Sequence, residues 1–383
     1  MQFSEALSFE ALLSFTSVDK GLPGTISYPS PNAYTENEFW LISPGLVYTG
    51  DAWVTHLFYS RSQSDLEGQG PYSVTDDEIE SDELSVLFDC TVSDAILLSY
   101  GLLYRNEELE RKPTAYANSS SQLGSYLQVL WQAGGHLELR GGLRGDQYSD
   151  YDNALTANLE FIYDGFFPDL TIFGKVASSY APPSANDLAY DAITSSSVDP
   201  EQGLSYELGL RQELDESFSW TAAFFYNDME DLIEFNYLGF YDGAYQYDVY
   251  NVSDARMQGV ELGMDWEPGN QITCSLGYTY LETEDADGDR LLRRPRHSLQ
   301  TTVVFELADS IRLGASGFGY FDSKETGTKG DDYFLAEISA DWAISHNWSV
   351  YARVENLFDL EYEPVPDYPA LGRAGYLGTS YRF

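Results

Sequence analysis

Three arginines form the first group of residues with the composition of a binding site. Arg293, Arg294 and Arg296 stand close together just before a segment with strand character. Guanidinium groups hold phosphate or carboxylate groups through bidentate, charge-assisted hydrogen bonds. The cluster is therefore a candidate ligand-binding site. The alternative explanation is that the arginines pair with phosphates outside the protein or with acids of the same loop. Isolated surface ion pairs of that kind contribute little stability.

The second group is acidic. Asp285, Asp287 and Asp289 alternate with small residues, and clustered carboxylates suit a hard cation such as Ca²⁺. An EF-hand is excluded, because Arg296 occupies the twelfth position of the loop, where an EF-hand needs glutamate. The segment is thus either a candidate calcium site in an extracellular loop or a solvated turn.

Catalytic motifs are not visible in the sequence. None of the four histidines has a partner at the spacing of a zinc site, and sequence places no Ser or Cys nucleophile near His136. With 62 Asp and Glu residues, pairs suited to glycoside chemistry arise by chance and are uninformative. The sequence predicts a protein that is not an enzyme and has no cofactor apart from the possible Ca²⁺.

Composition narrows the class of protein further. The chain has 383 residues, and its 62 acidic against 20 basic residues give a formal net charge of −42. This excess of acid excludes nucleic acid as a partner, because binding to phosphates needs cations. Disorder is also excluded, because 15% of the residues are aromatic. No apolar run reaches the length of a transmembrane helix, and no signal peptide is visible at residue 1.

Apolar and polar residues alternate with a period of two along most of the chain. Residues 334–342 and 348–355 are typical examples, and this pattern is that of β-strands with two different faces. It predicts an all-β fold. Eighteen strands are expected, at residues 2–17, 39–49, 52–65, 82–91, 95–106, 121–132, 136–144, 154–163, 170–181, 204–214, 218–230, 248–266, 271–282, 297–307, 310–321, 333–345, 348–358 and 374–383.

The predicted connections alternate between long and short. The long ones include 66–81, 106–120 and 231–247, and the short ones include 50–51 and 346–347. Long loops at one end and short turns at the other are typical of a transmembrane antiparallel β-barrel. Both chain ends should then lie at the short-turn, periplasmic end. A soluble propeller also alternates, but it repeats every 40–50 residues or so, and the sequence shows no such repeat.

Aromatic and charged residues fit this interpretation. Several aromatic residues near strand ends are expected in the interfacial girdles: Tyr48, Trp53, Trp220, Tyr226, Tyr278, Tyr280 and Trp348. Eight charged residues are expected on the inner, wet face: Glu138, Arg140, Arg144, Lys175, Glu207, Arg211, Arg353 and Glu355. On the lipid face a Lys or Arg would cost about 2–4 kcal/mol at the midplane.

Ordered sequence phrases in the C-terminal two-thirds carry a family resemblance. They are Gly142–Asp150, Tyr180–Pro183, Asn186–Leu188, Asp199–Glu201, Tyr206–Arg211, Phe225–Asp228, Asp231–Ile233, Asn251, Gly259–Leu262, Val354–Asp359, Tyr362 and Gly372–Arg373. Taken together they resemble the barrel of TonB-dependent outer-membrane receptors, the active importers of Gram-negative bacteria. The terminal Tyr381 and Phe383 look like that family's signal to the barrel-assembly machinery.

The resemblance also implies parts that the sequence does not show. Receptors of this family have 22 strands, a plug that fills the lumen, a TonB-binding box and a signal peptide. Residues 1–383 are therefore expected to be one domain, the C-terminal barrel portion, without the plug, the TonB box and the first strands. We expect a truncated gene or a gene fragment.

What the family does gives the functional expectation. An intact relative would capture a large scarce ligand, cobalamin or a ferric siderophore, and import it with the help of TonB. The implied location is the Gram-negative outer membrane, and the implied partners are its lipid and lipopolysaccharide, the barrel-assembly machinery, a small-molecule ligand, and TonB if a plug and box are supplied upstream. Two alternatives remain: a passive porin-like channel made by this chain alone, and a soluble extracellular β protein such as a lectin or propeller.

Overall fold

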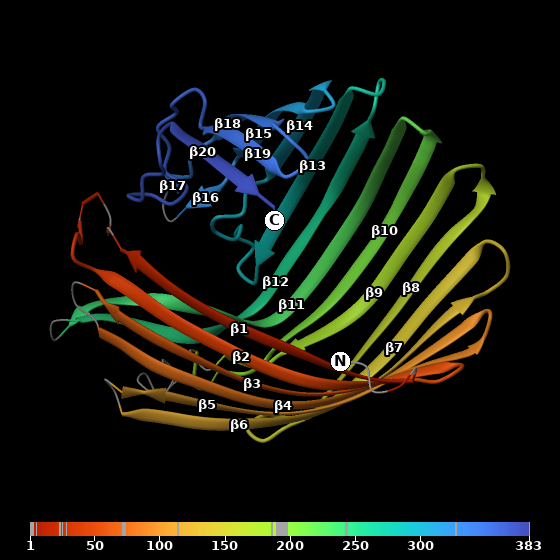
Figure 1. The fold of residues 1–383 in the computed structure, drawn as a ribbon. Helices are drawn as coiled ribbons and strands as arrows, with labels where there is room; N and C mark the ends of the chain where they lie inside the picture. The colour runs from red at the N-terminus through yellow and green to blue at the C-terminus, as the bar shows by residue number, and fades with distance from the viewer. Residues whose placement is uncertain are drawn as a thin grey trace.

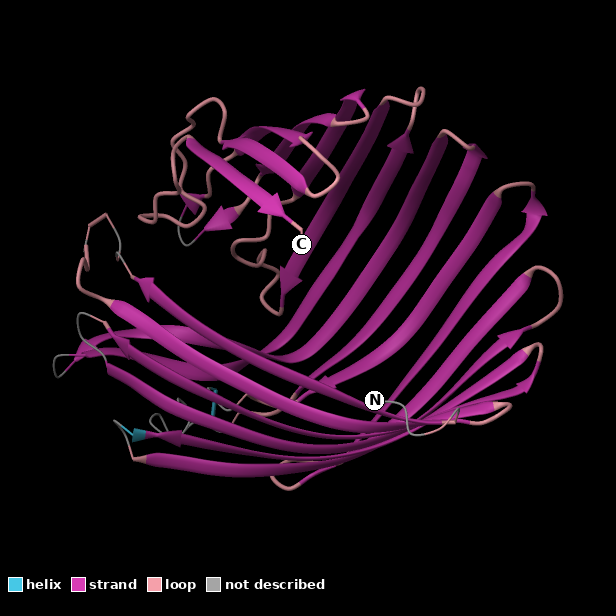
Figure 2. Cartoon of the chain, viewed as in Figure 1, coloured by secondary structure: helices cyan, strands magenta, loops and turns pink. Residues whose placement is uncertain are grey.

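The fold is a single large curled sheet. The computed structural model describes residues 1–383 except 1–3, 5, 23, 25, 28, 71–73, 113–114, 185–186, 189–197, 242–243, 326–327 and 383. Eighteen of the strands in this part of the chain form one antiparallel sheet, and two short strands form a separate hairpin (Figures 1 and 2). No helix among the described residues is long and apolar enough to cross a bilayer.

Each strand of the large sheet pairs with its neighbour in sequence, except that β15 pairs with β18 across the small β16–β17 hairpin. The all-β prediction and its count of eighteen sheet strands are confirmed. The strands are β1 (Leu7–Gly21), β2 (Tyr34–Thr49), β3 (Trp53–Gln69), β4 (Val74–Ser93), β5 (Ile96–Arg111), β6 (Tyr116–Gln132), β7 (Leu137–Tyr148), β8 (Ala154–Phe167), β9 (Leu170–Ala181), β10 (Glu201–Asp215), β11 (Phe218–Tyr241), β12 (Ala244–Trp266), β13 (Ile272–Asp285), β14 (His297–Ala308), β15 (Ile311–Phe321), β16 (Lys324–Glu325), β17 (Thr328–Lys329), β18 (Tyr333–Ala343), β19 (Trp348–Glu355) and β20 (Ala374–Tyr381).

Several predicted long loops prove to be strand. The segments expected as loops at 66–81, 106–120 and 231–247 are mostly absorbed into β3–β4, β5–β6 and β11–β12, whose turns are short. The sequence of these segments lacks the period-two contrast: residues 66–81 and 106–120 are mostly polar at consecutive positions, and in 231–247 apolar residues such as Leu232 and Ile233 are adjacent instead of alternating. The backbone ladder does not depend on that contrast and continues. The β3–β4 and β5–β6 hairpins therefore extend well beyond the apolar part of the sheet.

The register separates a lipid-type face from a polar face. On β10 the even-numbered Leu204, Tyr206 and Leu208 are exposed on one face, while Glu207 and Arg211 lie on the other. Paired residues share a face across neighbouring strands, so the assignment propagates round the whole sheet. All seven aromatic residues expected in girdles fall on the apolar outer face.

The two ends of the sheet remain separate in the described part of the chain, where no ladder joins β1 to β20. The start of β1 at Leu7 and the end of β20 at Tyr381 both lie at the short-turn end, and the two strands are not side by side (Figure 1). At the long-loop end the gap between them is bridged. The carboxylate of Asp367 accepts hydrogen bonds from the amide and hydroxyl of Ser27, at 3.0 Å each, and its carbonyl accepts one from the Ile26 amide.

The face assignment predicts that two nearby arginine substitutions on β10 will change the free energy of unfolding by different amounts. Leu208→Arg places a charge on the apolar face, where Leu208 is 56% exposed, and should cost about 2–4 kcal/mol near the midplane. Ser205→Arg places the same charge on the polar inner face and should change the free energy of unfolding little. Urea unfolding in lipid vesicles measures both. Equal losses in the two variants would contradict the assignment.

Candidate functional site

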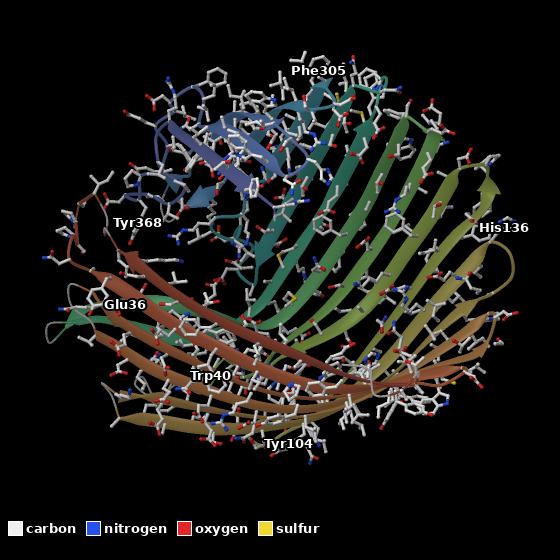
Figure 3. The ribbon with its side chains drawn as sticks, viewed as in Figure 1. Glu36, Trp40, Tyr104, His136, Phe305 and Tyr368 are labelled. Atoms are coloured by element: carbon white, nitrogen blue, oxygen red, sulfur yellow. The ribbon has the colours of Figure 1, made fainter. Side chains whose placement is uncertain are left out.

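The outer face changes from apolar to acidic along a defined row. Tyr59, Leu84 and Tyr104 lie side by side on β3, β4 and β5 as the last apolar row. Beyond them the same face carries ten carboxylates, which we call the acidic wall: Glu36, Glu38, Asp65, Glu67, Asp76, Glu78, Glu80, Asp82, Glu108 and Glu110. Carboxylates are expensive to place in hydrocarbon. The row therefore marks the level beyond which this face no longer suits hydrocarbon; we call it the boundary row, and the acidic wall lies beyond it. Figure 3 labels Glu36 of the acidic wall and Tyr104 of the boundary row.

The inner face carries all eight charged residues expected there, as the registers show. Four residues form a transverse row in which charge alternates from strand to strand: Arg140, Glu160, Lys175 and Glu207 on β7 to β10. Arg140 lies 3.4 Å from both Glu138 and Glu160. The row stabilises a polar wall that faces a wet lumen, because alternating charges on adjacent strands attract one another.

The three candidate arginines have different surroundings. Arg296 binds Glu282 at 2.7 Å and Asp322 at 2.9 Å. Arg293 has a left-handed backbone, with φ of 56°, and binds the buried Glu325 at 3.3 Å. Arg294 is exposed and makes only a 3.4 Å hydrogen bond to a neighbouring carbonyl. Arg293 and Arg296 thus bind nearby carboxylates, whereas Arg294 has no carboxylate within 4.0 Å among the described residues.

Further ion pairs join the same two loops, 286–296 and 322–332. Arg290 lies 3.4 Å from Asp322, and Lys324 lies 2.8 Å from Asp289. Within the second loop, hydrogen bonds from the Lys329 ammonium and from the Asp322 amide lower the pKa of Asp332, which therefore stays ionised. We call this network the loop clasp. It connects the two neighbouring loops, and most of their Lys and Arg side chains are paired with carboxylates in it.

The acidic cluster forms a turn that is closed on itself. The carboxylate of Asp285 accepts hydrogen bonds from the amides of Asp287, at 3.1 Å, and Asp289, at 2.8 Å. Asp289 is also occupied by Lys324. In the described part of the chain, no group of three or more His, Cys, Asp or Glu side chains is placed to hold a metal ion. The calcium site stays a prediction without structural support.

The predicted assembly signal is only partly visible. Tyr381 lies on the outer face of β20 and is 60% exposed. Phe383 lies outside the described residues. The role of both in assembly stays a prediction.

Two asparagine side chains bind the backbone of neighbouring segments, and we call each of them a joint. The search of the sequence for catalytic and binding residues did not predict this role. The side chain of Asn251 accepts a hydrogen bond from the amide of Asp199, at 2.8 Å, and donates to the carbonyls of Asp199 and Asp231, at 2.9 and 2.6 Å. Asp231 has φ of 57° and is left out of the β11–β12 ladder. Asn251 thus satisfies the backbone where β11 becomes irregular. Its place among the family phrases was the signal in the sequence.

The second joint closes the last long connection. Asn356 is buried and has φ of 46°. Its amide nitrogen donates to the carbonyls of Leu360 and Leu371, and its oxygen accepts from the amide of Leu360. Together with the Asp359 carboxylate, which accepts from the Arg373 amide at 2.8 Å, it folds residues 356–373 into a fixed loop. Asn251, Asn356 and Asp359 belong to the sequence phrases that resemble the family, and they fix the backbone of the long connections. This structural role does not require contact with a ligand.

A small cavity of about 110 Å³ lies on the inner side of the sheet at its long-loop end, which we call the mouth of the barrel. Its walls come from the inner face of β5 and β6 and from the loops after β7 and β9. Tyr148 and Tyr151 provide aromatic surface, Glu107 and Asp150 provide carboxylates, and Arg105 is already bound to Glu83 at 2.7 Å. Ligand sites for drug-sized molecules occupy about 300–1,000 Å³. The cavity therefore suits a side group of a larger ligand.

The comparisons with known proteins agree with this architecture. The family model described as "TonB dependent receptor-like, beta-barrel" matches residues 5–357. This chain belongs to that family. The vitamin B12 transporter BtuB of Photobacterium profundum is 24% identical over 368 residues, which are 93% of this chain and 59% of that protein. BtuB of Vibrio cholerae is 24% identical over 353 residues, 88% of this chain and 56% of its own length.

Solved structures show the same fold. The siderophore receptor PirA of Pseudomonas aeruginosa superposes with a TM-score of 0.75 at 16% identity, over 99% of this chain and 74% of PirA. A mutant of the ferric enterobactin receptor PfeA, also from P. aeruginosa, gives 0.81 at 15% identity, over 100% and 68%. The chain spans a little over half the length of the BtuB relatives. The predicted family and the prediction of a non-enzyme are confirmed, because the family consists of receptors and transporters.

The loop clasp predicts different effects for two neighbouring arginines. Arg296→Ala removes the ion pairs with Glu282 and Asp322, leaving Asp322 only the longer contact with Arg290, and should cost about 1 kcal/mol. It should also make the 322–332 loop more sensitive to protease. Arg294→Ala is the matched control and should change stability by less than about 0.5 kcal/mol. If both variants are cleaved at the same rate, the clasp does not hold the loops.

The Asn251 joint predicts a local effect on the β11–β12 hairpin. Asn251→Ala leaves one amide and two carbonyls unpaired, at a cost of about 1–3 kcal/mol. Proteolysis should therefore accelerate between 231 and 253. Asn347→Ala removes one hydrogen bond, to the Arg382 carbonyl in a short turn, and serves as control. A hairpin that stays as resistant in Asn251→Ala as in the control would contradict the joint.

Proposed function

We propose that this chain forms the barrel portion of an outer-membrane receptor that takes up a large scarce ligand, cobalamin or a ferric siderophore, with the help of TonB. The observation that carries the proposal is the match to vitamin B12 transporters along 88–93% of the chain. The apolar outer face with its aromatic residues and the polar inner face support a barrel embedded in the Gram-negative outer membrane.

The open sheet supports the presence of further strands in the working protein. Unpaired backbone groups at the edges of β1 and β20 would be costly in lipid. Since β1 leaves the short-turn end and β20 returns to it, any strands inserted between them in antiparallel order must be even in number. We propose that polypeptide outside residues 1–383 supplies these strands, together with the plug and the TonB box.

The remaining partners are part of the same proposal. Tyr381 and Phe383 would address the barrel-assembly machinery, and lipopolysaccharide would surround the acidic wall above the boundary row. Divalent cations would screen this negative surface from the lipopolysaccharide phosphates. A passive channel made by residues 1–383 alone is less well supported, because the sheet does not close among the described residues.

Uptake in a bacterial host tests the proposal. The gene, with the reading frame that surrounds it in its genome, is expressed in a Gram-negative strain that lacks its own cobalamin and siderophore receptors. We expect growth on limiting cyanocobalamin or on a ferric siderophore, and loss of that growth when the host's TonB is deleted. Uptake that is equal with and without TonB would contradict energised import and would favour the passive channel.

A further inference from the structure

Positive charge in the long connections is scarce. The connections at the long-loop end, 22–33, 70–73, 112–115, 149–153, 182–200, 242–243, 286–296, 322–332 and 356–373, contain sixteen carboxylates against eight Lys or Arg residues. This is a surplus of eight negative charges. The acidic wall just below these loops adds to it, and its ten carboxylates face only a few cations such as Arg61.

The few cations are also occupied. Seven of the eight have a carboxylate within 4.0 Å: Lys112, Arg290, Arg293, Arg296, Lys324, Lys329 and Arg373. The eighth is Arg294, whose guanidinium has only a backbone carbonyl nearby among the described residues. A polyanionic ligand needs several unpaired donors in one place. Among the described residues, the long connections offer one, and Lys20, which is exposed at the long-loop end of β1, adds a second cation without a carboxylate within 4.0 Å.

The cavity at the mouth also has more carboxylates than unpaired cations. Glu107 and Asp150 contribute carboxylates, and the single arginine in the lining, Arg105, is bound to Glu83 through both Nε and Nη2. Tyr148 stacks on Tyr180 with ring centroids 5.6 Å apart and presents aromatic surface beside them. Such a lining accepts hydrogen bonds and favours cations or flat apolar groups.

We propose that the mouth of this barrel selects ligands by charge: it admits neutral and cationic ligands and excludes polyanionic ones. The inference rests on the proposed function and narrows it, because a ferric complex with three catecholates carries three negative charges, whereas cobalamin and ferric tris-hydroxamates are neutral. A mouth lined by one sign of charge concentrates ions of the opposite sign and changes association rates by about 10–10³-fold.

The first experiment measures the charge preference without any ligand. Ser120, which lines the mouth cavity, is replaced by cysteine (Ser120→Cys) in a Cys90→Ser/Cys274→Ser background and labelled with a neutral fluorophore. Caesium, iodide and neutral acrylamide are compared as collisional quenchers. Each quenching constant is divided by the constant for the free fluorophore, and we expect this normalised constant to be about tenfold larger for caesium than for iodide at low salt. The ratio should approach one at 1 M salt, where the Debye length is about 3 Å. A low-salt ratio of one or below would overturn the inference.

Two double variants locate the effect. Glu107→Gln/Asp150→Asn removes two charges at the mouth and should lower the caesium-to-iodide ratio at position 120. Glu306→Gln/Asp309→Asn removes two charges at the short β14–β15 turn, at the opposite end, and should leave the ratio unchanged. Equal effects of the two variants would mean that the preference reflects net charge alone and not the mouth, which would also overturn the inference.

The second experiment uses ligands on the full receptor. Binding of cyanocobalamin, a neutral ferric tris-hydroxamate, its derivative with one ammonium group, and a ferric tris-catecholate is measured at low and high salt. We expect the tris-catecholate to bind at least tenfold more weakly at low salt than the best neutral or cationic ligand. Tight binding of the tris-catecholate that weakens with added salt would overturn the inference. If none of the four binds while the quenching asymmetry persists, the proposed function fails and the charge preference of the mouth stands.

Discussion

The structure depends on one constraint, which is that a backbone inside a bilayer must pair its amides and carbonyls within the protein. An antiparallel sheet meets this constraint strand by strand, and side chains then alternate between lipid and lumen. The faces of β10 show the result, with Leu204 and Leu208 on one side and Glu207 and Arg211 on the other. The same constraint makes the gap between β1 and β20 the most informative feature of the chain, since edges cannot face lipid unpaired.

Charge is arranged around this framework in layers. Inside, opposite charges alternate across adjacent strands, as in the row from Arg140 to Glu207. Above the boundary row, acids outnumber bases, and the bases are used to tie loops together, as Arg296 does with Glu282 and Asp322. Most Lys and Arg side chains of the long connections thus bind carboxylates of the protein, and few are left to bind an anionic ligand.

The sequence predicted the strands well where one face is apolar. Period-two alternation located all eighteen sheet strands and the face of every girdle aromatic, because lipid enforces the contrast between faces. It failed at 66–81, where consecutive residues are mostly polar, and at 231–247, where apolar residues do not alternate with polar ones; in both segments only backbone pairing reveals a strand. The candidate site was less predictable. Spacing brought Arg293, Arg294 and Arg296 together, but their partners Asp322 and Glu325 come from another loop.

The most direct test of this account is a spin-label scan along β10 in lipid vesicles, one cysteine at a time from 204 to 211 in a background without Cys90 and Cys274. Accessibility to oxygen, which dissolves in lipid, is compared with accessibility to a water-soluble nickel chelate. The account predicts oxygen maxima at 204, 206, 208 and 210 and nickel maxima at the odd positions. A profile without a two-residue period, or with the phases reversed, would contradict it.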